Sequence, residues 1–101
     1  MPTVKQTPTF PFLRVADLST SHLRPSDIAI INDPAAVGVS LSGEQGALVY
    51  LPEPSELGAR TDAGYSPAFV ELLRIALAQG FTHIRFDAAG TVVAGLPTFE
   101  S

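Results

Sequence analysis

The stretch from Ser66 to Phe86 constrains the fold most, because it carries the start and stop signals of a helix that runs into a strand. Ser66 is a suitable N-cap, and Pro67 suits the first helical position. Gly80 is the left-handed residue expected just past the helix end. Apolar side chains cover most of the circumference between them, so this helix needs a sheet to pack against. Residues 82–86 alternate with period two and predict the strand beneath it.

The composition indicates one modest domain that is soluble and is expected in the cytoplasm. The chain has 101 residues, of which 46% are hydrophobic and only 16% are charged. No apolar run approaches the roughly 18 residues that a membrane span requires. The six basic residues are dispersed and the net charge is −4, which argues against nucleic-acid binding. There is no cysteine, so disulfides and thiol chemistry are excluded.

The remaining segments predict an arm, a set of short strands and a second helix. Residues 1–11 hold three prolines and predict an extended or disordered arm, and residues 12–101 are expected to form a single domain. Pro25 opens a short helix that ends before Pro34. The other predictions are strands at 12–18, 37–41, 47–51 and 91–93, a hairpin turn at 42–46, a structureless loop at 52–65 and a turn opened by Asp87.

This element order predicts an α+β fold. We expect an antiparallel-rich sheet of about five strands with two helices on one face, in the order β-α-β-β-α-β-β. The pattern leaves the order of the strands within the sheet open.

Two patterns suggest catalysis without completing it. The run Asp87-Ala88-Ala89-Gly90-Thr91 looks like the D-x-D-G-T motif of haloacid-dehalogenase-type phosphatases, but Ala89 replaces the second carboxylate. Ser21, His22 and Asp87 supply the residue types of a small hydrolase, which requires that the three side chains converge. No nucleophile elbow accompanies them, so we expect no catalytic residues, and this enzyme stays an alternative.

Cofactor and metal sites are not expected either. The sequence has no Walker loop and no dinucleotide fingerprint. Its two histidines, His22 and His83, lie far apart and have no short-range ligand beside them. We expect His83 to be a surface residue on the polar face of its strand.

Several short motifs together resemble an uncharacterised family of small bacterial proteins. They are Ser19-Thr20-Ser21-His22-Leu23, the helix start at Arg24-Pro25, Phe86-Asp87-Ala88-Ala89-Gly90 and Gly95-Leu96-Pro97-Thr98-Phe99-Glu100. The chain departs from the family's pattern at Arg24, where a threonine is common, and at Ala89, where a second acid is common. Members of this family are carried on plasmids, integrated elements and phages and have no assigned function. The resemblance implies an accessory protein of a mobile element and no reaction.

These observations favour a non-enzymatic protein-binding module, such as an inhibitor of a host defence complex of the CRISPR effector kind. The loop 52–65 is longer than its connection requires, so it is the expected contact surface. The residues expected to bind the partner are Glu53, Glu56, Arg60, Asp62 and Tyr65. A structural subunit that self-associates through a sheet edge, for example as a homodimer, is a further alternative.

Overall fold

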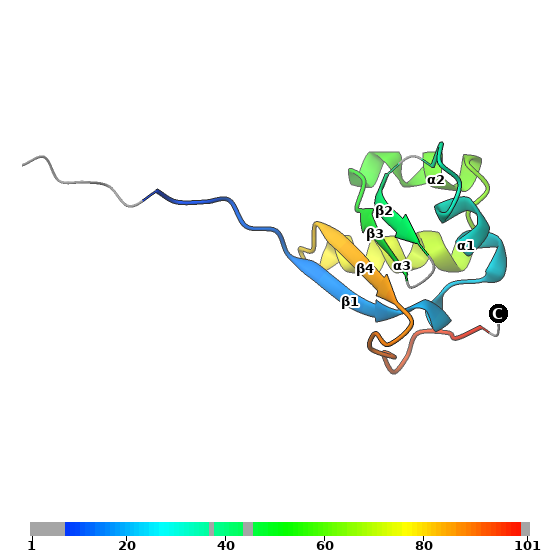
Figure 1. Cartoon of the computed structure of the whole chain (residues 1–101). Helices are drawn as coiled ribbons and strands as arrows, with labels where there is room; N and C mark the ends of the chain where they lie inside the picture. Colours follow the sequence, from blue (N-terminus) through cyan, green and yellow to red (C-terminus); the bar gives the residue numbers. More distant parts are fainter. Residues whose placement is uncertain (1–7, 37, 44–45, 100–101) are drawn as a thin grey trace, which may run out of the picture.

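The computed structural model describes residues 8–36, 38–43 and 46–99 and has the expected α+β fold (Figure 1). In chain order the elements are β1 (Val15–Ser19), η1 (Thr20–His22), α1 (Pro25–Ile31), β2 (Val39–Gly43), β3 (Gly46–Tyr50), η2 (Pro54–Glu56), α2 (Leu57–Asp62), α3 (Pro67–Ala78) and β4 (His83–Asp87). The predicted hairpin is present as β2 and β3, although positions 37, 44 and 45 of that prediction lie outside the described residues. None of the described helices has both the length and the apolar character needed to cross a membrane.

Over the described residues the sheet has four strands in the order β1-β4-β3-β2, so the prediction of about five strands is wrong. β1 runs parallel to β4, while β4 with β3 and β3 with β2 are antiparallel. The predicted last strand at 91–93 does not form. The N–H of Val93 bonds to the ring of His22 instead of to a neighbouring strand. Thr91 contacts β1 through its carbonyl, which accepts the Ser19 N–H at 2.8 Å, and through its hydroxyl, which donates to the Asp17 carboxylate at 3.2 Å.

α3 and its two ends agree with the prediction from the sequence. The Ser66 hydroxyl accepts the Phe69 N–H at 3.2 Å, as an N-cap does. At the other end Gly80 has φ = 82°, and the Phe81 N–H bonds back to the Ala76 carbonyl at 3.1 Å. Because the cap fixes where the helix starts, it also fixes which residues face the sheet.

A buried carboxylate links the start of α3 to α1. Asp27 is 1% exposed and accepts the Ser66 N–H at 2.8 Å and the Ser66 hydroxyl at 2.6 Å. A buried carboxylate is costly unless it is fully bonded, and these two bonds stabilise it at the N-terminus of α3. The same contact holds α1 and α3 together.

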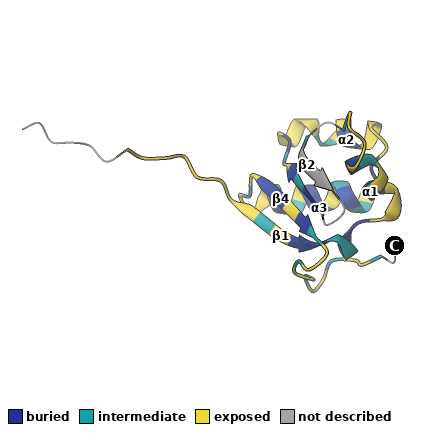
Figure 2. Cartoon of the chain, viewed as in Figure 1, coloured by how far each residue is buried: buried dark blue, intermediate teal, exposed yellow. Residues whose placement is uncertain are grey.

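The core lies between α3 and one face of the sheet (Figure 2). On β4 the side chains of Ile84 and Phe86 are buried, and the ring of Phe86 lies 6.2 Å from that of Phe69. The buried apolar residues are Leu18, Leu23, Ile31, Ala47, Val49, Tyr65, Phe69, Leu72, Leu73, Ala76, Ile84 and Phe86. The opposite face of the sheet presents exposed side chains at Asp17, Tyr50 and Arg85.

The segment 52–65 is not the structureless loop that was predicted. It contains the short helices η2 and α2, and α2 packs against α3. Arg60 and Tyr65 are buried, and the Tyr65 ring stacks on Phe69 with 4.3 Å between centroids. Burial of these two side chains stabilises a helix that is too short to be stable by itself.

Three further predictions meet the structure differently. Residues 8–14 form an exposed extended arm, which includes residues 8–11 of the predicted arm and residues 12–14 of the predicted first strand, while residues 1–7 lie outside the described chain. The first strand begins at Val15 instead of residue 12. His83 is 6% exposed, so its prediction as a surface residue is wrong. The Tyr50 ring covers its imidazole, with 4.6 Å between the ring centroids.

We predict that Leu73→Ala destabilises the protein by about 2–5 kcal/mol, the range for truncating a buried leucine. Leu73 is fully buried on the sheet side of α3. Glu71 lies on the exposed side and pairs with the exposed Arg74, so Glu71→Ala should change the free energy of unfolding by less than about 0.5 kcal/mol. Urea denaturation measures both, and equal losses would contradict this assignment of the helix faces.

Candidate functional site

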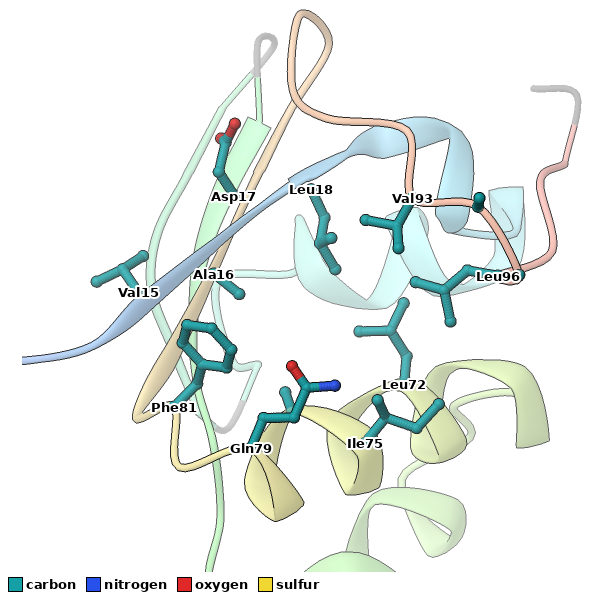
Figure 3. A pocket seen from close by; sticks show the side chains of 13 residues that line it. Val15, Ala16, Asp17, Leu18, Leu72, Ile75, Gln79, Phe81, Val93 and Leu96 are labelled. Carbon is teal, nitrogen blue, oxygen red and sulfur yellow. The ribbon is translucent and has the colours of Figure 1, made fainter.

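An apolar groove lies between the outer edge of β1, α3 and the segment 93–96 (Figure 3). Its volume is about 470 Å³. From β1 the side chains of Ala16 and Leu18 point toward α3, while Val15 and Asp17 point to the other side of the sheet. The remaining lining residues are Leu72, Ile75, Ala76, Gln79, Phe81, Val93, Ala94, Gly95 and Leu96. A smaller hollow of about 240 Å³ shares four of these residues, so the groove extends toward His22 and Pro97.

His22 holds the third wall of the groove in place. Its Nδ1 lies 2.8 Å from the Pro97 carbonyl, and its Nε2 lies 2.9 Å from the Val93 N–H. A carbonyl only accepts and an N–H only donates, so the ring is a neutral imidazole with its proton on Nδ1. His22 is 2% exposed, and both of its nitrogens are occupied by backbone groups.

Two more contacts fix the segment that follows this wall. The Phe99 N–H donates to the Ser21 carbonyl at 2.7 Å. The Arg24 guanidinium lies over the Phe99 ring, 4.4 Å from its centroid. Arg24 makes no side-chain cap to α1, so at this position the chain gives up a helix cap and gains a contact with the wall segment.

The backbone edge of β1 is open beside the groove. The Arg14 carbonyl accepts N–H groups from Thr82 and His83, so the even-numbered residues of this strand direct their backbone groups to β4. The odd-numbered residues therefore direct theirs outward. At Ser19 the outward N–H is taken by Thr91. Among the described residues no strand pairs with this side of β1 at Val15 and Asp17.

An ion pair lies on the other face of this edge. Arg85 donates to Asp17 at 2.8 Å, and the Thr91 hydroxyl donates to the same carboxylate at 3.2 Å. The hydrogen bond from Arg85 lowers the pKa of Asp17 below its usual value, and the same bond raises the pKa of Arg85. A lowered carboxyl pKa contributes stability above the ordinary pKa, which is lost as pH falls through the lowered one. Both groups are exposed, so the effect is small.

The three hydrolase candidates have structural partners. The Ser21 hydroxyl pairs with the Ser19 hydroxyl at 2.9 Å, and Asp87 accepts the Ala89 N–H at 2.8 Å, which starts the predicted turn. A general base needs a free nitrogen near the nucleophile, whereas both nitrogens of His22 bond to the wall segment. Within the described parts of the chain, no three His, Asp or Glu side chains gather in a group that could hold a metal ion.

The residues expected to bind a partner divide into two sets. Glu53, Glu56 and Asp62 are exposed on η2, on α2 and just before them. Arg60 and Tyr65 are buried, and burial raises the pKa of Tyr65 above its usual value. The side chains of Arg60 and Tyr65 therefore anchor residues 53–65, the acidic segment, to the body of the domain.

The groove has no local signature in the sequence. Its three walls come from residues 15–18, 72–81 and 93–96, which no local pattern connects. The available signal was the small residue Ala16 in a strand and the glycine-containing segment after Val93, but neither one specifies a groove.

These features define a small α+β domain with an apolar groove beside an open strand edge. The chain belongs to a family of unknown function, DUF5983, whose C-terminal domain matches residues 15–101. No curated protein and no solved structure matches it.

We predict that His22→Phe loosens the wall of the groove. The substitution keeps a planar ring and leaves the Val93 N–H and the Pro97 carbonyl without their partner, which should cost about 1–3 kcal/mol. Hydrogen exchange at the Val93 amide should also accelerate. Thr98→Ala, an exposed change on the same segment, should alter neither quantity. An unchanged exchange rate at Val93 in the His22 variant would mean that the imidazole does not hold the wall.

Proposed function

We propose that this domain is a non-enzymatic protein-binding module that holds an extended segment of a protein along β1. The observation that carries the proposal is the apolar groove beside the outward backbone groups of Val15 and Asp17. In strand addition, the added chain gains affinity from main-chain hydrogen bonds and specificity from alternate side chains that enter pockets. The groove lies where such side chains would enter.

The electrostatics of the groove favour an apolar segment. Most of its lining is aliphatic, and the Asp17 carboxylate turns away from it toward Arg85. Gln79, at the end of α3, is the polar side chain that remains at its rim. An anionic or strongly polar small molecule would find few partners here, whereas an aromatic or aliphatic side chain would be desolvated on several sides.

The biological setting belongs to this proposal as well. The motif Ser19-Thr20-Ser21-His22-Leu23 and the segment from Gly95 onward support the resemblance to accessory proteins of mobile elements. On that basis the bound protein is a component of a bacterial host, met in the cytoplasm. An inhibitor of a defence complex of the CRISPR effector kind is the specific form we propose.

We predict that Ala94→Arg abolishes binding of the partner protein. Ala94 is exposed at the groove, so the new side chain places a charge over an apolar site with little effect on folding. Ala88→Arg, an exposed change in the turn after β4, is the matched control. Affinity capture from a bacterial lysate with quantitative mass spectrometry measures both variants. Retention of every captured protein by Ala94→Arg would contradict binding at the groove.

The acidic segment provides a second contact in this proposal. Glu53 and Glu56 are exposed in the turn before α2, where the Glu56 N–H bonds to the Glu53 carbonyl, whereas Arg60 on α2 is buried. The double change Glu53→Lys and Glu56→Lys should lower partner affinity by up to about tenfold and make it less sensitive to salt, because rim charges act mainly through long-range attraction. Titration of the captured partner at two salt concentrations measures this. Unchanged affinity would restrict the contact to the groove.

A further inference from the structure

The arm that precedes β1 exposes large apolar side chains. Phe10 is 81% exposed, Phe12 is 85% exposed and Leu13 is 61% exposed. The arm continues in line with β1 and leaves the body of the domain (Figures 1 and 2). Three large apolar side chains in so short a segment are typical of an interaction surface.

The arm cannot fill the groove of its own copy. Arg14 is held extended by Thr82, whose hydroxyl accepts the Arg14 N–H at 3.2 Å and whose N–H donates to the Arg14 carbonyl at 2.8 Å. The groove lies alongside β1, after Arg14 in the chain, whereas the arm extends from Arg14 toward the N-terminus. Phe12 would have to reverse direction within the two residues before β1, which would break these bonds.

The open edge of β1 has limits that are symmetric about Val15. At one end, Thr91 already occupies the outward N–H of Ser19. At the other end, Pro11 has no N–H to offer. If the alternation of β1 continues into the arm, the outward groups left between these limits belong to Leu13, Val15 and Asp17. An edge with equal limits on both sides of one residue suits antiparallel pairing with an identical edge.

We propose that the occupant of the groove is the arm of a second copy of this chain. The two β1 edges pair antiparallel with Val15 opposite Val15 of the second copy and Leu13 opposite Asp17, which joins the two sheets into one. This proposal rests on the proposed function for the groove and its open strand edge, and it adds that in the absence of a host protein the arm of the second copy occupies the same site.

This register brings Phe12 to the groove. Phe12 lies opposite Leu18 of the second copy. Leu18 points toward α3, and with the alternation of β1 continued into the arm Phe12 lies on the same side of the sheet. The aromatic ring then enters the space lined by Leu72, Ile75 and Leu96 of the second copy. On the other side of the sheet the register places no like charges opposite each other, since Asp17 meets Leu13. Each copy thus supplies one ring and one groove.

The first experiment measures the mass of the whole chain by sedimentation equilibrium, with Phe12→Asp as the variant. We expect a dimer whose dissociation constant the substitution raises by at least about 10- to 100-fold. That range is the effect of losing one buried aromatic side chain, and the dimer loses two. Phe12 is exposed in the single copy, so the variant should fold normally. Val92→Asp, a similar change of an exposed apolar residue outside the groove, is the matched control and should leave the dimer intact.

The second experiment tests the register. The chain has no cysteine, so Val15→Cys introduces the sole thiol. Directly opposite residues of a hydrogen-bonded antiparallel pair have Cα atoms about 5.5 Å apart, within the range of a disulfide. Mild oxidation should therefore link two Val15→Cys chains, and Val92→Cys chains should not be linked above the level of random collision.

A monomeric wild-type chain, or a dimer that Phe12→Asp does not weaken, would overturn the inference. The proposed function is tested by different outcomes. A monomer that still loses a host protein on Ala94→Arg would leave the binding role in place and give the groove another occupant. A dimer that is unaffected by Ala94→Arg would count against the groove itself.

Discussion

The structure depends on the bond between the Asp27 carboxylate and Ser66. Ser66 accepts the Phe69 N–H as the cap of α3 and at the same time donates its hydroxyl proton to Asp27. One side chain thus sets the start of the main helix and ties it to α1. Because the start is fixed, Leu73 and Phe69 reach the sheet. The α3 wall of the groove follows from the same register, since Leu72 and Ile75 lie on the adjoining side of the helix.

How far the sequence predicts this molecule depends on how local each signal is. The cap at Ser66, the left-handed Gly80 and the turn at Asp87 are written within a few residues, and all three are confirmed. The strand predicted at 91–93 does not form because the Val93 N–H donates to the imidazole of His22, 71 residues away in the chain. The helix α2 was missed for a similar reason, because burial of Arg60 against the rest of the domain stabilises it and local propensity does not. The groove could not be predicted, since it exists only where three distant segments meet.

The polar residues that resemble catalytic groups instead position the chain. His22 joins the wall segment to the end of β1, and Asp87 shapes the turn that leads into that wall. Gly90 belongs to the same arrangement, because a side chain there would collide with the Leu18 carbonyl. The turn can therefore lie directly against β1, and the wall begins close to the strand edge. Ser21, His22 and Asp87 thus contribute to the shape of the groove.

The parallel pairing of β1 with β4 also has a consequence for how the protein forms. The two strands are 68 residues apart along the chain, whereas β2 and β3 are adjacent and α3 leads directly into β4. Contacts between distant segments form slowly, because a long loop must close before they yield any stabilisation. During synthesis the N-terminal strand is made first but has no neighbour until β4 has left the ribosome. The groove, whose walls come from β1, α3 and residues 93–96, is therefore complete only after β4 has joined the sheet and the segment beyond it has been made.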